Sequence, residues 1–531
     1  MPRPRQTPRS LAAVAVLMLA LGGCSSAEFA SSELDDVGDG YGGDGDGDPT
    51  GDPTGGETGE QTTTGDGDGD GDGDEGTEPE GSEDPGLEPA ECDPDFAQAI
   101  VHDLLDAQAE AAATLVRESV LAGSGKVPNI PLSARPFLNR FTFSYPPFSP
   151  PADGPELRVV GELWKPPMAN AESAPRYRLQ YAVQGPALPL GLRKPVDLAI
   201  VVDLGQGMVG EPLALAEEAL AAIEAALVPG DRVTLIGAAD QPQVLVQGSV
   251  VVDFGAGLLT GLLADQGPAY AANIAAALEL GYQTVAPSWE GQGQPRVLLI
   301  SNGHFQVDGA LLGLINDYAA DGHHLVALGL GAPESFAEAS LRQLAAEGRG
   351  ALLYDRSADQ LWRDMKERFA EHMLAAATEL EIRLVLPPGL TIRNRDPLAA
   401  EPDDLDDREL AVLGPDDEIV FHHELEACAP LDTDAVVRVE VDWIDPASNE
   451  AKQIVWEHSL AQLGYGSMAT RKGAATVAYA RALRGYRDGT RPNEGFAAVL
   501  DAISLIAEAL ESQPEDPDLI EMSQVLGKLE G

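Results

Sequence analysis

The sequence predicts a mixed α/β fold centred on a mostly parallel sheet with one antiparallel edge strand. The run Val196 to Val202 is apolar at nearly every position, which is typical of a strand buried on both faces. Alternating helix and strand patterns continue from there to Thr378. Period-two alternation flanks this region, at Tyr177 to Val183 and again from Leu380. We therefore expect an antiparallel β-sandwich built from both flanks, with the α/β part inserted between them.

The segment after the second strand of the central sheet predicts an antiparallel strand at the edge of that sheet. Arg232 to Ala238 has strand character and is followed by a turn at Asp240, Gln241 and Pro242. The apolar run Val244 to Val252 comes too soon for a crossover helix, so it forms a hairpin and runs antiparallel. The later elements are expected to be helix Ala271 to Val285, strand Val297 to Ser301, helix Ala310 to Ala320, strand Leu325 to Leu330, helix Ser335 to Ala346, strand Ala351 to Tyr354 and helix Asp359 to Thr378.

The C-terminal flank continues with strands and ends in helices. Apolar residues alternate along Leu380 to Leu386, Ile419 to Leu425 and Val437 to Trp443, as in half-buried strands. Helices are expected at Ala474 to Tyr486, Glu494 to Glu511 and Asp516 to Leu529. The second helix carries an apolar stripe that we expect to lie in the core: Phe496, Leu500, Ile503, Ile506 and Leu510.

Asp203 stands at the carboxyl end of the first core strand, where open α/β sheets bind their ligands. The glycine-rich turn after it matches the dinucleotide fingerprint G-x-G-x-x-G at Gly205, Gly207 and Gly210. A dinucleotide-binding unit follows its second strand with another crossover helix, however, and not with a hairpin. A Rossmann-like enzyme that binds a nucleotide or methyl donor stays as an alternative, and a helix after Asp240 would favour it.

Several segments resemble bacterial lipoproteins with a von Willebrand factor type A (VWA) domain. The loop Asp203 to Met208, DLGQGM, resembles the D-x-S-G-S-M metal loop of VWA domains, and Val297 to Val307 resembles their T-D-G-D-F-N-V loop. Val116 to Phe148 and Lys472 to Tyr486 resemble the N-terminal extension and the C-terminal region of one such family. The resemblance covers most of the chain after about Ala97 and implies a Rossmann-like VWA domain.

The resemblance also implies a metal-ion-dependent adhesion site, whose ligands this sequence has largely lost. Serine is replaced by glycine at both positions of the first loop, the second loop aligns Gly267 and Pro268 with serine and threonine, and asparagine replaces aspartate in the third. The degenerate positions are Asp203, Gly205, Gly207, Pro268 and Asn302. Magnesium needs near-octahedral oxygen coordination. We predict that no metal and no cofactor is bound; a weak site rescued by backbone carbonyls and water is the alternative.

We therefore favour the interpretation that the VWA-like part is a non-enzymatic binding or scaffolding module, which binds a protein partner without a metal ion. The candidate ligand-binding residues are Asp203, Gln206, Asn302 and His304. Catalytic motifs such as G-x-S-x-G and H-E-x-x-H are absent from the sequence. We expect no catalytic residue and no small-molecule substrate.

The beginning of the chain predicts export and lipid anchoring. Three arginines precede the apolar run Leu11 to Leu21, which is too short to span a bilayer and fits a signal peptide. Leu21, Gly22, Gly23 and Cys24 form a lipobox. The resemblance to lipoproteins implies cleavage before Cys24 and acylation there, which anchors the protein to a membrane. Ser25 favours the outer membrane of a Gram-negative envelope over the inner membrane.

Composition divides the rest of the chain. The Gly/Asp repeats before Cys92 cannot bury enough apolar surface to fold and are expected to form a disordered tether. We expect a signal peptide (1–23), an acidic tether (24–91), an N-terminal extension (92–195), the VWA domain (196–378), a strand region that contributes to one sandwich with 156–185 (379–460) and C-terminal helices (461–531).

The formal net charge of −53 excludes nucleic acid as a plausible partner. Once Cys24 is acylated, Cys92 and Cys428 remain as a candidate disulfide pair in an oxidising compartment. Such a bond would join the start of the folded region to the C-terminal sandwich.

Overall fold

The computed structural model describes most of the chain after Cys92. The described residues are 93–102, 104, 110–150, 156–165, 176–188, 193–250, 257–286, 293–393, 411–463, 466–488 and 494–530. The expected signal peptide, lipidation site Cys24 and acidic tether lie outside them, as does Cys92. Cys428 is disulfide-bonded, and its pairing with Cys92 stays a prediction.

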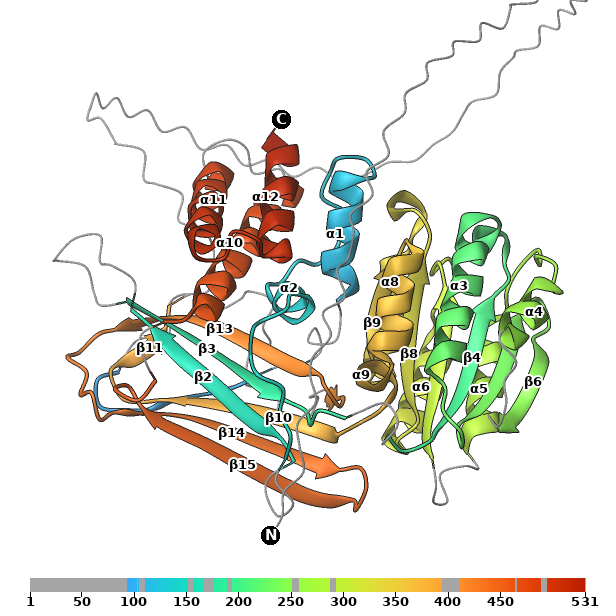
Figure 1. Cartoon of the computed structure of the whole chain (residues 1–531), viewed down its shortest axis with the longest axis horizontal. Coiled ribbons are helices and arrows are strands. Elements are labelled where there is room, and N and C mark those ends of the chain that lie inside the picture. The colour runs from blue at the N-terminus through green and yellow to red at the C-terminus, as the bar shows by residue number, and fades with distance from the viewer. Residues whose placement is uncertain are drawn as a thin grey trace, which may run out of the picture. The chain divides into compact units, whose positions relative to one another are not determined.

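The buried apolar strands form the central sheet (Figure 1). Within the described residues its order is β6-β5-β4-β7-β8-β9. The strands are β4 Val196–Asp203, β5 Arg232–Ala238, β6 Gln243–Val250, β7 Gln294–Ser301, β8 His324–Leu330 and β9 Leu352–Asp355. Only β6 is antiparallel to its neighbour in this described sheet. A strand therefore follows Asp240, and the predicted fold class is confirmed.

Helices cover both faces of this sheet and bury its five parallel strands, whereas the edge strand β6 is largely exposed. One face packs against α3 Glu211–Ala226, α4 Leu258–Ala264, α8 Ala358–Trp362 and α9 Phe369–Met373. The other packs against α5 Ile274–Val285, α6 Gly309–Ala320, α7 Glu338–Glu347 and α1 Ala111–Leu121. The predicted helix Asp359 to Thr378 is wrong at its C-terminal end, because the last helical residue is Met373. The chain passes through a π-helical turn at Arg363–Glu367, becomes extended at Leu374 and enters β10 at Ala377.

Two antiparallel sheets form the sandwich. The first contains β1 Gln98–Val101, β10 Ala377–Leu386, β12 Ala411–Leu413, β14 Val436–Asp445 and β15 Glu450–Ser459. The second contains β2 Arg158–Trp164, β3 Arg176–Gln184, β11 Leu390–Ile392 and β13 Glu418–Ala427. Strand β3 pairs with β13 from Gln184 opposite Glu418 to Arg176 opposite Glu426. Segments on the two sides of the central α/β region thus share one sheet, and their inward residues form one core.

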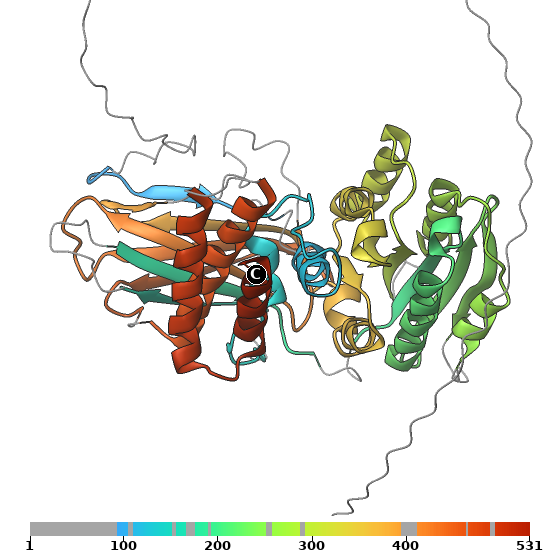
Figure 2. The same cartoon turned by 90° about the horizontal axis from the view of Figure 1, so that it is seen from above.

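The C-terminal helices are α10 Met468–Asp488, α11 Glu494–Ser512 and α12 Pro517–Glu530. They pack with α1, with α2 Arg135–Arg140 and with the outer face of β3 and β13 (Figure 2). The expected core stripe of α11 is wrong in part, because Leu500 and Ile503 are 49% and 36% exposed. The buried face instead runs through Val499, Ala502, Ile506 and Ala509, where small side chains let the neighbouring helices approach. None of the described helices is long and apolar enough to cross a bilayer.

Candidate functional site

The candidate site lies at the carboxyl edge of the central sheet. Strands β4 and β7 are adjacent and parallel, with Val202 opposite Ile300, so the loops that follow them meet at the same edge. The β4 loop contains a short 3-10 helix at Gln206–Met208 and ends where Gly210, at φ 92°, precedes α3. Only glycine adopts this backbone conformation easily, which explains the third glycine of the turn.

The Asp203 carboxylate is held inside this edge. Its Oδ2 accepts a hydrogen bond from the Ser301 hydroxyl at 2.7 Å, and its Oδ1 accepts one from the Gly205 amide at 2.8 Å. Asp203 is only 4% exposed. Burial raises the pKa of Asp203, and the two hydrogen bonds oppose that shift. The part played by Ser301 was missed from the sequence, where it appears only as the last residue of a strand.

The two glycines of the first loop are closely packed. A Cβ on Gly207 would lie 2.3 Å from Nδ2 of Asn302, and a Cβ on Gly205 would lie 3.0 Å from Oδ1 of Asp203 and 3.5 Å from Cβ of Ala272. The Asn302 carboxamide therefore occupies the space that a side chain at Gly207 would need. Glycine at 207 and asparagine at 302 fit each other sterically.

The second loop reaches the first through residues other than those aligned from the sequence. Gly267 and Pro268 are exposed, and a Cβ on Gly267 would meet open space. The Ala269 amide instead donates to the Leu204 carbonyl at 2.7 Å, and Ala272 packs near Gly205. Ala272 carries no side-chain oxygen, so the second loop still offers no hydroxyl at this point.

The four candidate ligand-binding residues divide into two buried and two exposed side chains. Asp203 and Asn302 are buried, and the Asn302 Oδ1 accepts a hydrogen bond from the His304 amide at 3.1 Å. Gln206 and His304 are exposed. The His304 Nε2 lies 2.8 Å from the Ser335 carbonyl oxygen, which orients the ring at the surface. Asp203 and Asn302 thus shape the loops, and Gln206 and His304 can touch a ligand directly.

Two exposed apolar residues at the same edge were missed from the sequence. Tyr270 is 86% exposed and Val209 is 51% exposed. Tyr270 follows Ala269, whose carbonyl accepts a hydrogen bond from Gln206 Nε2 at 3.4 Å. An aromatic residue in a Gly/Pro-containing loop without strand or helix periodicity was the available signal. We call Gln206, Val209, Tyr270 and His304 the exposed rim.

The residues present do not fit a magnesium ion. Both Asp203 oxygens already accept hydrogen bonds, and the Asn302 side-chain oxygen accepts one too. Gly205, Gly207 and Ala272 supply no side-chain oxygen. No group of three or more His, Cys, Asp or Glu side chains that could hold a metal is found in the described part of the chain. The side-chain oxygens of Asp203 and Asn302 thus accept hydrogen bonds from other groups of the protein. The loss of metal binding stays a prediction.

The strand order and the antiparallel edge define an α/β domain of Rossmann-like architecture. The chain is similar in structure to a von Willebrand factor type A protein from Catenulispora acidiphila, at 15% identity and a TM-score of 0.45, over 68% of this chain and 89% of that one. It is also similar to the ArnB paralog VWA2 from Sulfolobus acidocaldarius, at 15% identity and a TM-score of 0.39, over 71% and 98%. A third similar structure is BatB from Bacteroides thetaiotaomicron, at 17% identity and a TM-score of 0.28, over 32% and 95%. No protein-family model and no curated protein matches the sequence.

Proposed function

We propose that this protein is a lipid-anchored envelope protein whose α/β domain is a non-enzymatic protein-binding module that meets its partner without a bridging metal ion. The observation that carries the proposal is the exposed rim, which lies at the same edge of the sheet as the buried and internally hydrogen-bonded Asp203. Exposed tyrosine is typical of the central contacts of protein interfaces. A closed carboxylate network beneath such a surface supports recognition by side chains and not through a shared cation.

Anchoring rests on the sequence. The lipobox ending at Cys24 supports acylation, and Ser25 supports the outer membrane. The Gly/Asp repeats between Cys24 and Cys92 would extend by charge repulsion and hold the folded region away from the membrane surface. A Cys24→Ser variant should lose palmitate labelling and leave the membrane fraction. Retention of label in that variant would contradict the proposal.

The rim is tested by site-specific photo-crosslinking in intact envelopes. A photoreactive residue at position 270 should capture a discrete partner, and the same residue at Leu500, exposed on α11, serves as the matched control. After the partner is purified, Tyr270→Ser should weaken binding about 30-fold, as expected for a residue that contributes about 2 kcal/mol. EDTA should leave the affinity unchanged. Equal capture at both positions, or loss of binding in EDTA, would contradict the proposal.

A further inference from the structure

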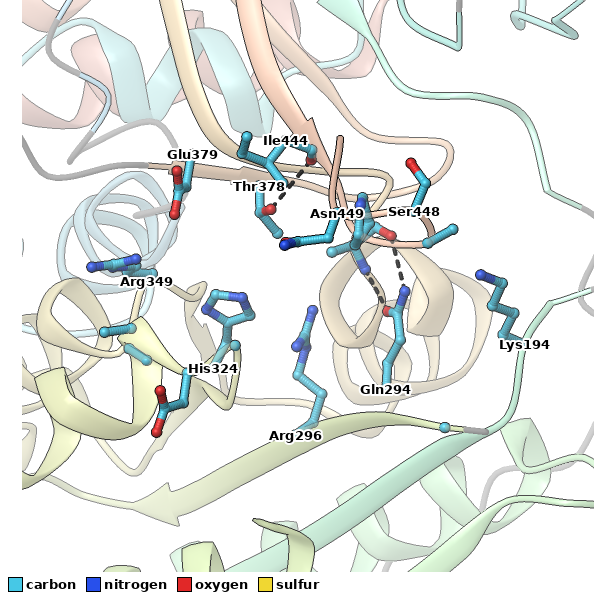
Figure 3. Close-up of a pocket in the computed structure, with 18 of the residues that line it drawn as sticks. Lys194, Gln294, Arg296, His324, Arg349, Thr378, Glu379, Ile444, Ser448 and Asn449 are labelled. Atoms are coloured by element: carbon cyan, nitrogen blue, oxygen red, sulfur yellow. Dashed lines mark hydrogen bonds between the residues drawn. The ribbon is translucent and has the colours of Figure 1, made fainter. Parts of the chain in front are cut away.

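A second candidate site lies at the opposite end of the central sheet. A cavity of about 830 Å³ opens at the amino ends of β7 and β8, between them and the β14–β15 turn of the sandwich (Figure 3). Arg296 and His324 pair in register on these two strands and line its floor. Figure 3 shows Arg296, His324 and Arg349 on one side, facing Thr378, Ile444 and Asn449 on the other. This volume is in the range of small-molecule sites.

Basic side chains that are not ion-paired line the cavity. Arg296 is only 3% exposed, and its guanidinium donates a hydrogen bond to the Pro295 carbonyl at 3.0 Å. Within the described residues, none of Lys194, Arg296 and Arg349 forms an ion pair, whereas the other buried arginine there, Arg193, pairs with Asp231. A buried charge that lacks a partner is unfavourable. Burial accordingly lowers the pKa of Arg296 to about 10.

The carboxylates near the cavity do not neutralise these cations. Asp321 and Glu379 also line the cavity, but both are exposed to solvent. Three further carboxylates, Glu110, Glu371 and Asp417, line a separate cavity of about 20 Å³ that shares Arg296 and His324. Glu110 and Glu371 are ion-paired with Arg368, and burial raises the pKa of Asp417 to about 7. The floor of the large cavity is therefore positive in a chain whose formal net charge is −53.

His324 adds a buried polar atom that has no partner. The residue is 4% exposed, and its Nδ1 has no hydrogen bond within the described structure. Burial, together with Arg296 and Arg349, lowers the pKa of His324 well below its usual value, and a hydrogen bond between the ring and the Gly348 backbone opposes that shift. Buried polar atoms usually have a partner, so an unpaired Nδ1 in the lining of a cavity is available to a ligand atom.

Backbone strain gathers at the same place. Arg349 and Glu379 line the cavity at φ 50° and φ 51°, in the left-handed region that non-glycine residues rarely adopt. Asn449, also in the lining, has φ 56° in the β14–β15 turn, where asparagine adopts this conformation without appreciable strain. Strained residues such as Arg349 and Glu379 are concentrated at ligand sites, where the surrounding structure holds them in place.

We infer that this cavity binds a small organic anion, whose phosphate or carboxylate group contacts Arg296, Arg349 and Lys194. Guanidinium groups bind both oxyanions in bidentate geometry. The cavity is much larger than an inorganic anion, and Ile444, Pro446 and Ala447 give it an apolar wall for an organic body. The site lies at the other end of the sheet from the exposed rim, so it does not depend on the function proposed there.

Calorimetric titration of the full chain tests the site, with phenyl phosphate and benzoate as probes in phosphate-free buffer. The two probes share a ring and differ in the anion, so their relative affinities identify the preferred oxyanion. We expect saturable binding of one probe. Arg296→Met, which keeps the volume of the side chain, and Arg349→Asn, which suits the positive φ, should each weaken it at least about tenfold, since a charge-assisted hydrogen bond contributes about 1.5–3 kcal/mol.

The control is Arg438→Gln, because Arg438 is 45% exposed on β14 and pairs with Glu457 and Glu440 far from the lining. It should leave the affinity unchanged. If Arg296→Met fails to fold, Arg349→Asn and Lys194→Gln, both at less buried positions, carry the test. The inference is overturned if neither probe binds saturably, if the cavity variants bind like wild type, or if Arg438→Gln weakens binding equally.

Discussion

Ser301 is the residue whose loss should most directly show how the carboxyl edge is held. The Ser301 hydroxyl donates to Asp203 Oδ2 at 2.7 Å and accepts from the Gly303 amide at 3.0 Å, and both bonds are buried. Ser301→Ala removes both. It leaves one carboxylate oxygen and one amide without partners in a closed space.

The size of the effect follows from these two bonds. A hydrogen bond to a charged group contributes about 1.5–3 kcal/mol, and a neutral one about 1 kcal/mol, so Ser301→Ala should destabilise the α/β domain by about 2–4 kcal/mol. A domain of this size shifts by about 2–4 °C for each kcal/mol, which predicts a fall of about 4–16 °C in melting temperature. In the variant the pKa of Asp203 should rise further, because the Ser301 hydrogen bond, which opposes the effect of burial in wild type, is lost.

Scanning calorimetry of the full chain measures the shift, and hydrogen exchange of β4 amides assigns the transition to the α/β domain. Ser335→Ala is the matched control, since the Ser335 hydroxyl is exposed and donates only to the nearby Ala332 carbonyl. It should shift melting by no more than about 2 °C. Excess magnesium should stabilise neither wild type nor Ser301→Ala. A Ser301→Ala protein that melts like the control, or that magnesium stabilises, would refute the reasoning.

Two further substitutions test the framework around the sites. Asp231→Asn removes the carboxylate that pairs with the Arg193 guanidinium, where both side chains are 0% exposed; the uncompensated buried charge should cost about 3–5 kcal/mol, and an unchanged calorimetric transition would contradict this. Burial raises the pKa of Asp417 from 3.8 to about 7, so the folded chain keeps a proton that the unfolded chain releases. The contribution of Asp417 to stability should therefore fall as the pH rises from about 4 to about 7, and the melting-temperature advantage of Asp417→Asn over wild type should grow over that range; an advantage that does not change with pH would contradict this.

Much of the architecture could be predicted because it depends on local patterns. The apolar run of β4 indicated a strand buried on both faces, and the turn after Asp240 indicated an antiparallel edge. The alternation around Leu179 and Phe421 indicated half-buried strands. Each pattern reports the environment of one element along its own length, and one sequence is enough to read it.

The helix α11 shows where such patterns fail. Apolar residues occupy more than one of its faces, so periodicity selected Leu500 and Ile503 for the core although both are exposed. The face that is buried holds Ala502 and Ala509, whose small side chains fit against the neighbouring helices. Hydrophobicity favours burial in general, but close packing decides which face is buried.

The sequence by itself determined the fold class, the position of Asp203 at a strand end and the scarcity of oxygen ligands around it. Only the tertiary structure decided that Ser301 holds Asp203, that Tyr270 lies beside the Gln206 loop, and that Arg296 and His324 face one cavity. These are contacts between segments far apart in the chain: Gln184 and Glu418, for example, are bonded across 234 positions. Such contacts depend on strand register and on how packed layers meet, and the periodicity of a single segment contains neither.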